Sequence, residues 1–389
     1  MRNEYDVVVI GGGPAGTTAA RHAAARGAAV ALFEKDREIG VPVRCAEGVS
    51  HAGLCQELEI QPRWIAQTIT GACLHAPSGA AVPLSSDQVG YILDRKAFDY
   101  DLGRMAAAAG VSLFMKAYVC GLILEQGCVC GVEVEHLGER RRIRSSIVIA
   151  ADGVESRAGR WAGLKTRTVL ADMESCAQVT IGGYAGDPEV IHFYFGQEIA
   201  PGGYAWIFPK GNGMANIGLG VAASAARVRS PHECLQAFLE REFPGAPVLS
   251  RVYGGVPCSG RFDDIVAGGL MLAGDAAHQA NPLTGGGIVT GLIGGRLAGQ
   301  TAAAAIAEGR YDRDRLRAYL RAWRQAQGDR QALYCRLRNF VFSLEDKDYN
   351  ALAVSVLALP PEKRSMINIF KSALIRKPSL ILDAVKLFT

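Results

Sequence analysis

The chain of 389 residues lacks the features of a membrane-spanning or exported protein. The charge-free stretch 276–295 is interrupted by Pro282 and by a run of three glycines, so we expect no helix that crosses a membrane. Glu4 and Asp6 interrupt the N-terminal segment that would have to be apolar in a signal peptide. These absences predict a cytoplasmic protein.

An excess of charge and metal-binding cysteine patterns are also lacking. The formal net charge of +4, from 42 Lys and Arg against 38 Asp and Glu, is too small to indicate a nucleic-acid partner. The ten cysteines form no Cys-x-x-Cys pair and show no Cys/His spacing typical of a metal site. We therefore predict reduced thiols, no metal and no nucleic acid. The length favours two or three folded domains.

The N-terminal residues have the pattern of a dinucleotide-binding βαβ unit. A β-branched run, 5–10, leads into three glycines at G-x-G-x-x-G spacing and then an alanine-rich helix to about residue 26. A second strand, 29–33, ends in Glu34, whose carboxylate can accept hydrogen bonds from an adenosine ribose. The glycines should permit a tight turn, the approach of a pyrophosphate and close helix–strand packing, in the order Gly11, Gly13 and Gly16.

A second glycine-rich motif lies far along the chain. The apolar strand 270–273 precedes Asp275, and the glycine triplet 285–287 opens a helix of small residues that runs to about residue 305. Asp275 would bond a ribitol, and the N-terminus of the helix would stabilise the negative charge of a reduced flavin. Two such motifs on one chain imply a single extended ligand, which favours FAD over NAD.

Two further segments agree with an FAD site. Asp152 and Gly153 end a strand in an acid–glycine turn that resembles the DG motif of flavoprotein hydroxylases. Arg95 opens another helix. It either reaches the pyrophosphate or ribitol of the cofactor or lies on the surface as a helix cap.

Together these motifs resemble those of the geranylgeranyl reductase family, in particular its archaeal members that saturate the prenyl chains of glycerophospholipids. Residues 42–48 resemble the PxxCGEG segment of the family, and residues 202–211 resemble its YxWxFP signature. The resemblance runs from Tyr5 to the end of the chain. The chain departs from the pattern at Ala46, where the family has glycine, and this leaves room for a different substrate.

The resemblance implies a set of cofactor contacts. Val119 is expected at the end of a strand, where only its backbone would meet the adenine. Position by position, the contacts with FAD fall at Ala15, Glu34, Cys45, Ala46, Gly48, Arg95, Val119, Asp275, Gly287 and Ile288.

The implied reaction requires a proton donor, because no carbonyl polarises an isolated double bond. A suitable route protonates the less substituted carbon and then adds hydride from the reduced flavin. Cys45 and Glu47 are the candidate catalytic residues, although Cys45 either donates the proton or only shapes the pocket. His278 is interpreted as a structural residue at a helix start.

An aromatic row is the candidate substrate contact. Tyr204, Trp206 and Phe208 alternate along a predicted strand and therefore face one side of it. Their ring faces would line a prenyl tunnel and stabilise a positive charge by about 0.5–2 kcal/mol each. The alternative is an aromatic-packed sheet face with no substrate contact.

The predicted fold class is α/β. A Rossmann-like FAD-binding domain of the p-hydroxybenzoate hydroxylase type is expected from 1–60, 90–165 and 256–310, and an antiparallel substrate-binding sheet from 61–89 and 166–255. A helical C-terminal region, 311–389, completes the chain. Its arginines suit either peripheral contact with anionic lipid at a membrane surface or an ordinary solvated helix face. They are Arg313, Arg317, Arg321, Arg324 and Arg338.

Other functions and partners stay open from the sequence. The main alternatives are an FAD-dependent aromatic monooxygenase of the same fold and a flavin redox sensor without turnover. The prenyl chain could be carried by a lipid, a diphosphate or a quinone. The electron donor could be a ferredoxin, a reduced deazaflavin or NAD(P)H, since no second dinucleotide fingerprint is present.

Overall fold

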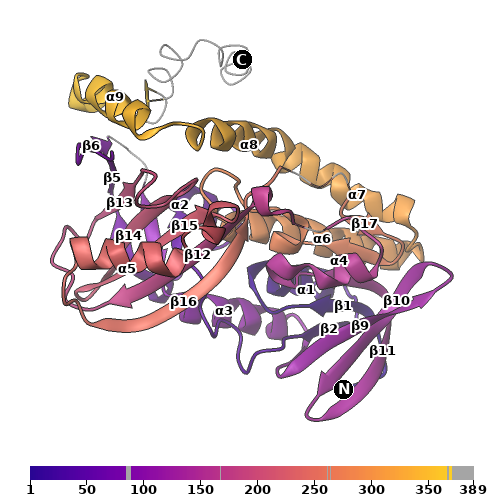
Figure 1. Cartoon of the computed structure of the whole chain (residues 1–389). Helices are drawn as coiled ribbons and strands as arrows, with labels where there is room; N and C mark the ends of the chain where they lie inside the picture. The colour runs from indigo at the N-terminus through magenta and orange to yellow at the C-terminus, as the bar shows by residue number, and fades with distance from the viewer. Residues whose placement is uncertain (85–88, 167, 261, 263, 366–367, 370–389) are drawn as a thin grey trace. The chain divides into compact units, whose positions relative to one another are not determined.

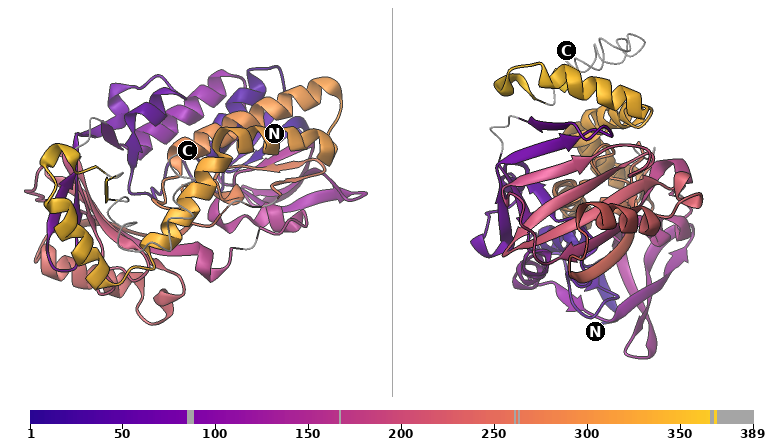
Figure 2. Two further views of the ribbon diagram at one scale, coloured as in Figure 1. Left: turned by 90° about the horizontal axis from the view of Figure 1, so that it is seen from above. Right: turned by 60° about the vertical axis from the view of Figure 1, so that its left-hand side comes forward.

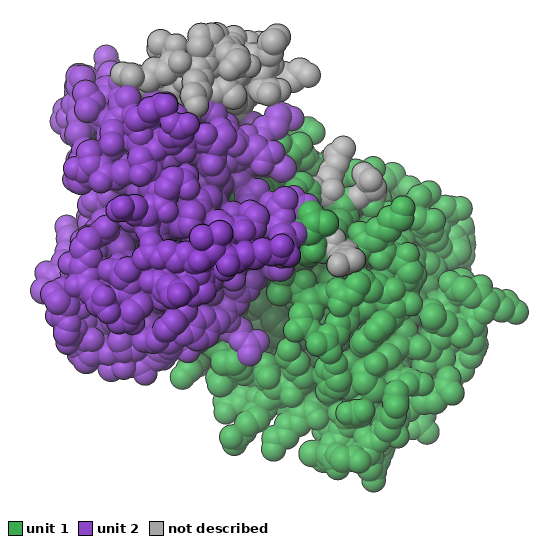
Figure 3. All heavy atoms as spheres, in the orientation of Figure 1, with its two compact units in different colours: residues 1–43, 95–169, 257–332 green, residues 44–94, 170–256, 333–389 purple. Residues whose placement is uncertain are grey.

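The computed structural model describes residues 1–84, 89–166, 168–260, 262, 264–365 and 368–369. The chain divides into two compact units, which Figure 3 shows in different colours. Unit 1 comprises residues 1–43, 95–169 and 257–332. Unit 2 comprises residues 44–94, 170–256 and 333–389. Both units are therefore assembled from three separate stretches of the chain.

Unit 1 is built on an eight-stranded sheet (Figure 1). Its main path runs in the order β17 (Val266–Ala267), β18 (Leu270–Leu272), β11 (Glu139–Ala150), β1 (Glu4–Ile10), β2 (Val30–Phe33) and β8 (Ser112–Phe114). The pairs from β18 to β8 are parallel. The first half of β11 pairs with β10 (Cys128–His136), which pairs with β9 (Ala117–Glu125), and both pairings are antiparallel. The central strands are apolar on both faces, as expected for a parallel sheet covered on both sides.

The helices of unit 1 follow its strands. They are α1 (Pro14–Ala24), α3 (Arg95–Ala108), α4 (Arg157–Trp161), α6 (Ile288–Glu308) and α7 (Arg313–Trp323). Short 3-10 turns lie at η2 (Gly153–Glu155) and η5 (Gly274–Ala277). A π-helical turn, η6 (Arg324–Gly328), leads into α8 (Asp329–Val341).

Unit 2 is built on a seven-stranded sheet. Its order is β16 (Val248–Pro257), β12 (Met173–Ile181), β15 (Met214–Ala222), β14 (Tyr204–Gly211), β13 (Val190–Tyr194), β5 (Gly71–His75) and β6 (Ala81–Leu84). The pairs β12–β15, β15–β14, β14–β13 and β5–β6 are antiparallel, whereas β13 and β5 run parallel. A three-stranded antiparallel sheet has the order β3 (Gly48–Ser50), β7 (Gly90–Leu93) and β4 (Ile65–Ile69).

Helix α5 (Pro231–Glu242) covers one face of the seven-stranded sheet, as the right-hand view of Figure 2 shows. Ser230 and Glu233 form a capping box at its start, and Leu235 and Phe238 pack on the sheet. The remaining described helices of unit 2 are α2 (His51–Cys55), the part of α8 from residue 333 onward, and α9 (Asp346–Leu357), with 3-10 turns at η1 (Pro62–Trp64), η3 (Leu170–Asp172), η4 (Ala225–Arg227) and η7 (Pro361–Lys363).

The fold class expected from the sequence is present, but two boundaries lie elsewhere than expected. Residues 44–60 belong to unit 2, because β3 pairs with β7. Residues 311–332 belong to unit 1, because Leu316, Tyr319 and Leu320 are part of its core. Within the described residues, no helix has the length and hydropathy needed to cross a membrane.

Candidate cofactor and active site

The three glycines of the β1–α1 turn have different surroundings. Gly11 has a φ of +98°, and a Cβ there would lie 2.3 Å from the carbonyl oxygen of Ala151. A Cβ on Gly16 would lie 1.9 Å from the carbonyl oxygen of Gly11. A Cβ on Gly13 would meet no described atom within 4 Å. Gly11 and Gly16 are thus required by close backbone packing, while Gly13 leaves space where a phosphate can approach.

Glu34 lies beside this turn at the end of β2. Its Oε2 accepts the backbone N–H of Gly12 at 2.6 Å, and its Oε1 accepts that of Asp36 at 2.8 Å. These bonds orient the carboxylate. The first turn of α1 has no side-chain cap among the described residues, so its N–H groups are available to an anion.

Helices α1 and α6 pack backbone against backbone. A Cβ on Gly295 would lie 2.2 Å from the carbonyl oxygen of Ala15, and one on Gly299 would lie 2.3 Å from that of Ala19. Gly291, in the first turn of α6, also lies against Ala15. No side chain in the described part of the chain caps α6 at Gly287, its N-cap residue. The glycines therefore bring two helix N-termini together, and both carry a partial positive charge.

Asp275 and Arg95 are two charged residues of unit 1 that interact electrostatically. Burial raises the pKa of the Asp275 carboxyl, and the charge of Arg95 opposes that rise. A Cβ on Gly287 would lie 3.2 Å from Asp275 Oδ1, so the carboxyl adjoins the start of α6. Arg95 donates two hydrogen bonds to Asp99, at 2.8 and 2.7 Å, with only 12% of its side chain exposed. Arg95 is therefore not an exposed surface residue, and its contact with the cofactor stays a prediction.

Asp152, in the acid–glycine turn, has an unused acceptor. Its Oδ2 accepts the backbone N–H of Ala158 at 3.0 Å, whereas its buried Oδ1 has no hydrogen-bond partner within the described residues. Burial raises the pKa of this carboxyl too. An unpaired buried oxygen is costly, which is typical of a group that a ligand completes. This oxygen, the open turn at Gly13 and the uncapped N-termini of α1 and α6 suit an extended cofactor that carries phosphates and hydroxyl groups.

The position of Val119 differs from the one expected. It is the third residue of β9, which begins at Ala117, and does not end a strand. Lys116, with a φ of +52°, reverses the chain after β8, so that β9 starts two residues earlier. Ala117 donates its N–H to the carbonyl oxygen of Glu34 at 2.8 Å. The start of β9 thus lies beside the predicted ribose-binding carboxylate.

The segment containing Cys45 is fixed within unit 2 by its neighbour Glu47. Glu47 is 1% exposed and has a φ of +74°. Its Oε2 accepts hydrogen bonds from Lys210 Nζ at 2.5 Å and from Asn216 Nδ2 at 2.6 Å. A Cβ on Gly48 would lie 2.9 Å from the ring of Phe208. The two family-like segments, 42–48 and 202–211, are therefore in direct contact.

Cys45 is linked to the aromatic row by one glutamine. Gln178 donates a hydrogen bond to the carbonyl oxygen of Cys45 at 2.9 Å and accepts one from Trp206 Nε1 at 3.2 Å. The Sγ atom of Cys45 accepts the backbone N–H of Glu47 at 3.2 Å. Gln178 therefore connects the indole of Trp206 to the backbone that carries the Cys45 thiol.

Tyr204, Trp206 and Phe208 lie on one face of β14, as their alternation predicted. The ring centroid of Trp206 is 5.9 Å from that of Tyr204 and 6.4 Å from that of Phe208. Trp206 and Phe208 are buried against Ile69 and Ile92 of the three-stranded sheet, while Tyr204 is half-buried.

Glu174 is a buried acid on the same sheet that sequence reasoning missed. It lies on β12, two residues from Cys176 and four from Gln178, so it faces the same side as both. Burial raises its pKa to about 7, and Arg338 of α8, 3.6 Å away, opposes the rise. Arg338 was expected on a basic helical surface, but it is buried because Glu174 and the Ala171 carbonyl oxygen attract its guanidinium.

His278 was expected at a helix start, but it follows the 3-10 turn η5 as its C-cap residue, ten positions before α6 begins. Its Nε2 lies 2.9 Å from Thr168 Oγ1, its Nδ1 bonds Ser259 Oγ, and its ring packs on Phe262 at 3.9 Å. Burial lowers its pKa to about 4. The imidazole is therefore neutral and enclosed.

Comparisons with known proteins identify the relatives of this chain. A family model for FAD-dependent oxidoreductases matches residues 6–193, and a model for the geranylgeranyl reductase catalytic domain matches residues 172–256. Digeranylgeranylglycerophospholipid reductase 1 of Methanococcoides burtonii is 42% identical over 100% of this chain and 96% of its own length. Digeranylgeranylglycerophospholipid reductase 1 of Methanothermobacter thermautotrophicus is 43% identical over 100% and 99%.

Solved structures give the same result. A geranylgeranyl bacteriochlorophyll reductase-like protein from Thermoplasma acidophilum has a TM-score of 0.92 and 35% identity over 99% of this chain and 100% of its own. The flavin-dependent brominase Bmp2, as a triple mutant, has a TM-score of 0.75 at 18% identity over 99% of each chain, and this likeness concerns the fold alone.

Fold and site thus define an FAD-dependent oxidoreductase. Within that class, the chain belongs to the geranylgeranyl reductase family.

Proposed function

We propose that this protein reduces isolated carbon–carbon double bonds in the prenyl chains of a glycerophospholipid. Whole-length identity of 42% to a protein named for that reaction supports the substrate class. The observation that carries the proposal is the contact between the Cys45 segment and the aromatic row, through Gly48, Phe208 and Gln178. This contact places the thiol-bearing segment of Cys45 beside the apolar surface formed by the aromatic row.

Unit 1 would hold the cofactor. Gly11, Gly13, Ala15 and Gly16 would frame the turn for the pyrophosphate, Glu34 would bond the ribose, and Val119, the third residue of β9, would meet the adenine through its backbone. Arg95, Asp275, Gly287 and Ile288 serve the ribitol and flavin side. Cofactor contacts of Cys45, Ala46 and Gly48 rest on the family resemblance. FAD, when bound and reduced, supplies the hydride.

Cys45 is the preferred proton donor. The carboxylate of Glu47 already accepts bonds from an ammonium and an amide, which suits it to positioning the segment. The thiol of Cys45 would give its proton to the less substituted alkene carbon, and water would restore it. One proton and one hydride together saturate one double bond and would leave the flavin oxidised, so each further turnover requires two electrons from an external reductant.

The aromatic row would exclude water and stabilise positive charge on the protonated chain. Two of its rings are buried, and an aromatic face contributes about 0.5–2 kcal/mol to binding a cation. Half-buried Tyr204 is the ring most open to a substrate.

Peripheral contact with a membrane is part of this proposal, because the substrate is a lipid. Arg321 and Arg324 are exposed at the end of α7 and the start of η6. Arg313 and Arg317, on the same helix, pair with Asp264. We expect the protein to float with anionic vesicles in a sucrose gradient. With neutral vesicles it should remain at the bottom of the gradient.

Lipid analysis tests the substrate. Cells that make digeranylgeranyl glycerophospholipid should, on expression of this gene, accumulate lipids heavier by multiples of two hydrogens. Unchanged lipids from cells that contain FAD-loaded protein and a reductant would contradict the proposal. Stimulation of NADPH oxidation by a phenol would favour the monooxygenase alternative.

A further inference from the structure

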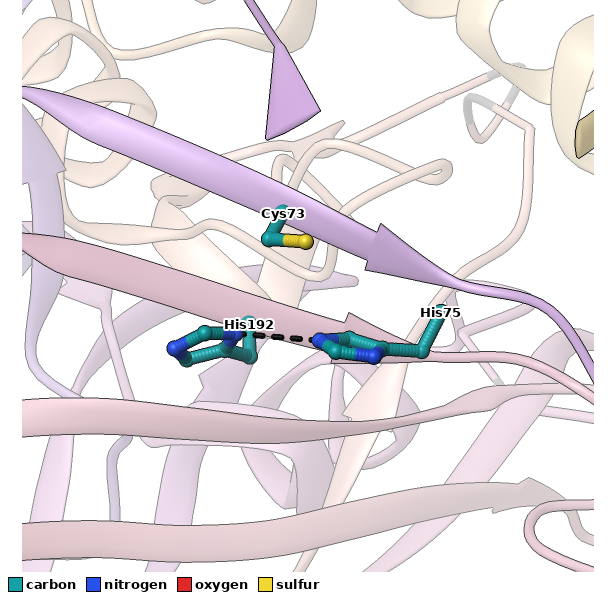
Figure 4. A group of neighbouring side chains, drawn as sticks. All are labelled: Cys73, His75 and His192. Carbon is teal, nitrogen blue, oxygen red and sulfur yellow. Dashed lines mark hydrogen bonds between the residues drawn. The ribbon is translucent and has the colours of Figure 1, made fainter. Parts of the chain in front are cut away.

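A cluster of sulfur and nitrogen donors lies on the seven-stranded sheet. Cys73 and His75 are on β5, His192 is on β13, and their ligand atoms all lie within 4.8 Å of one another. Register brings them together, since Cys73 pairs with His192 and His75 with Tyr194. Residues two apart on a strand face the same side, so the three side chains project together, as Figure 4 shows.

The cluster lies on the opposite face of the sheet from the aromatic row. His192 pairs with Ile207, while Phe193 pairs with Trp206. Ile207 belongs to the core beneath α5, and the ring centroid of Tyr194 lies 5.0 Å from that of Phe238 in α5. Substitutions in the cluster therefore leave the proposed substrate contacts in place.

The two imidazoles are positioned by their surroundings. His75 Nε2 lies 3.0 Å from His192 Nδ1, which places one shared proton between nitrogens that face each other. Tyr194 stacks on His75 with ring centroids 4.0 Å apart. Both imidazoles are half-buried and reach one another from neighbouring strands.

We propose that Cys73, His75 and His192 bind one Zn²⁺ ion. Thiolate and imidazole are the usual zinc ligands, and the cluster offers no oxygen donor that would favour Mg²⁺ or Ca²⁺. Tetrahedral zinc with bonds of about 2.0–2.3 Å sets its ligand atoms roughly 3.3–3.6 Å apart. The three ligand atoms, all within 4.8 Å of one another, would draw together around the ion by rotation of their side chains. The fourth position is left to water or a small anion.

The ion would act as a clamp. β5 and β6 form one edge of the sheet, and β5 is attached to the rest through its parallel pairing with β13. Parallel pairs are slightly less stable per residue than antiparallel ones. A metal held by β5 and β13 would fasten the edge hairpin, and Zn²⁺ should slow backbone hydrogen exchange in both strands.

Cobalt titration tests this site. Untagged, FAD-loaded protein is stripped with a chelator and titrated with Co²⁺, whose thiolate charge-transfer and tetrahedral d–d bands are visible beside the flavin. We expect one equivalent to bind and Zn²⁺ to displace it. Cys73→Ser should remove the charge-transfer band, and His192→Gln should keep the band but weaken binding at least 100-fold.

A second Cys/His pair provides the control. Cys55 Sγ lies 3.3 Å from His51 Nε2 on exposed α2, and Cys55→Ser should leave the titration unchanged. The absence of one bound equivalent, binding unaffected by both Cys73→Ser and His192→Gln, or binding lost in Cys55→Ser would each overturn the proposal. If Cys73→Ser fails to retain FAD, His192→Gln decides the outcome alone. No arm measures lipid reduction, so the two proposals fail separately.

Discussion

At the scale of single residues, the carboxylates of this protein show how surroundings assign a task. Glu34 accepts two backbone N–H groups, Glu47 accepts an ammonium and an amide, and Glu174 faces a buried guanidinium. The task of Glu34 could be predicted, because its partners are local and part of a motif. That of Glu174 could not, because Arg338 comes from a distant helix and no pattern pairs them.

Replacement of Glu34 should weaken cofactor binding. Glu34→Ala removes a charge-assisted bond to the ribose worth about 1.5–3 kcal/mol, so we expect the Kd for FAD to rise about tenfold to a hundredfold. Glu38→Ala, which removes an exposed acid from the same loop, is the matched control and should leave Kd unchanged. Titration of apoprotein with FAD measures both. Equal affinity in the two variants would place the ribose elsewhere.

Replacement of Cys45 should slow reduction of the alkene. General acid catalysis contributes about 10²–10⁴-fold, so Cys45→Ala should lower the single-turnover rate per FAD-loaded molecule by that factor. Its solvent isotope effect should also change, since another group must deliver the proton. Cys55→Ala, at an exposed thiol, should behave as the wild type. A Cys45→Ala enzyme at full speed would assign the proton to another residue.

Glu174 should give the stability of the protein a particular pH dependence. Its pKa is about 7 in the folded protein and near 4.5 in the unfolded chain, so unfolding releases a proton between these values. The protonated Glu174 contributes roughly 3 kcal/mol to the free energy of unfolding. This contribution is complete below about pH 4.5 and is lost as the pH rises through 7.

Urea unfolding of the wild type and of Glu174→Gln at several pH values isolates this contribution. The stability of the wild type relative to the variant should fall between pH 4.5 and 8. Parallel curves would show that the folded protein holds Glu174 ionised throughout.

At the scale of elements, the motifs located the strands and helices within a few residues but not their packing. The helix after the glycine triplet was expected to run to about residue 305 and ends at Glu308. The sequence shows glycines at 291, 295 and 299, four residues apart along this helix. No sequence motif near them indicates that the helix packs on α1. Likewise, alternation placed the aromatic row on one face of β14, but only the register of β12 brings Gln178 to Trp206.

The contact between α1 and α6 should be intolerant of a single methyl group. Gly295→Ala places a Cβ against the Ala15 carbonyl oxygen, and such overpacking costs about 1–3 kcal/mol. We expect a lower melting temperature and weaker FAD retention, because the two helix N-termini move apart. Gly254→Ala, where a Cβ meets no described atom within 4 Å, is the control. Equal melting of the two variants would contradict the packing.

At the scale of the whole molecule, the sequence predicted the class and an FAD-binding domain made of three separate stretches, and unit 1 is also made of three. It did not predict that residues 44–60 belong to unit 2 or that the region 311–389 is divided between the units, because these assignments depend on strand pairing and packing between distant segments. The cluster of Cys73, His75 and His192 could not be predicted from the sequence either. Their spacing along the chain suggested no metal site, and the parallel register of β5 and β13 alone brings them together.

A single-turnover experiment tests whether this flavoenzyme delivers hydrogen to a prenyl chain. Protein reduced anaerobically with one equivalent of dithionite is mixed with digeranylgeranyl glycerophospholipid, and flavin absorbance is followed before the lipid is analysed by mass spectrometry. We expect flavin reoxidation at a rate that depends on lipid concentration, with one double bond saturated per flavin. A flavin that stays reduced with the prenyl lipid, yet reoxidises with a phenol and oxygen to give a hydroxylated product, would contradict it.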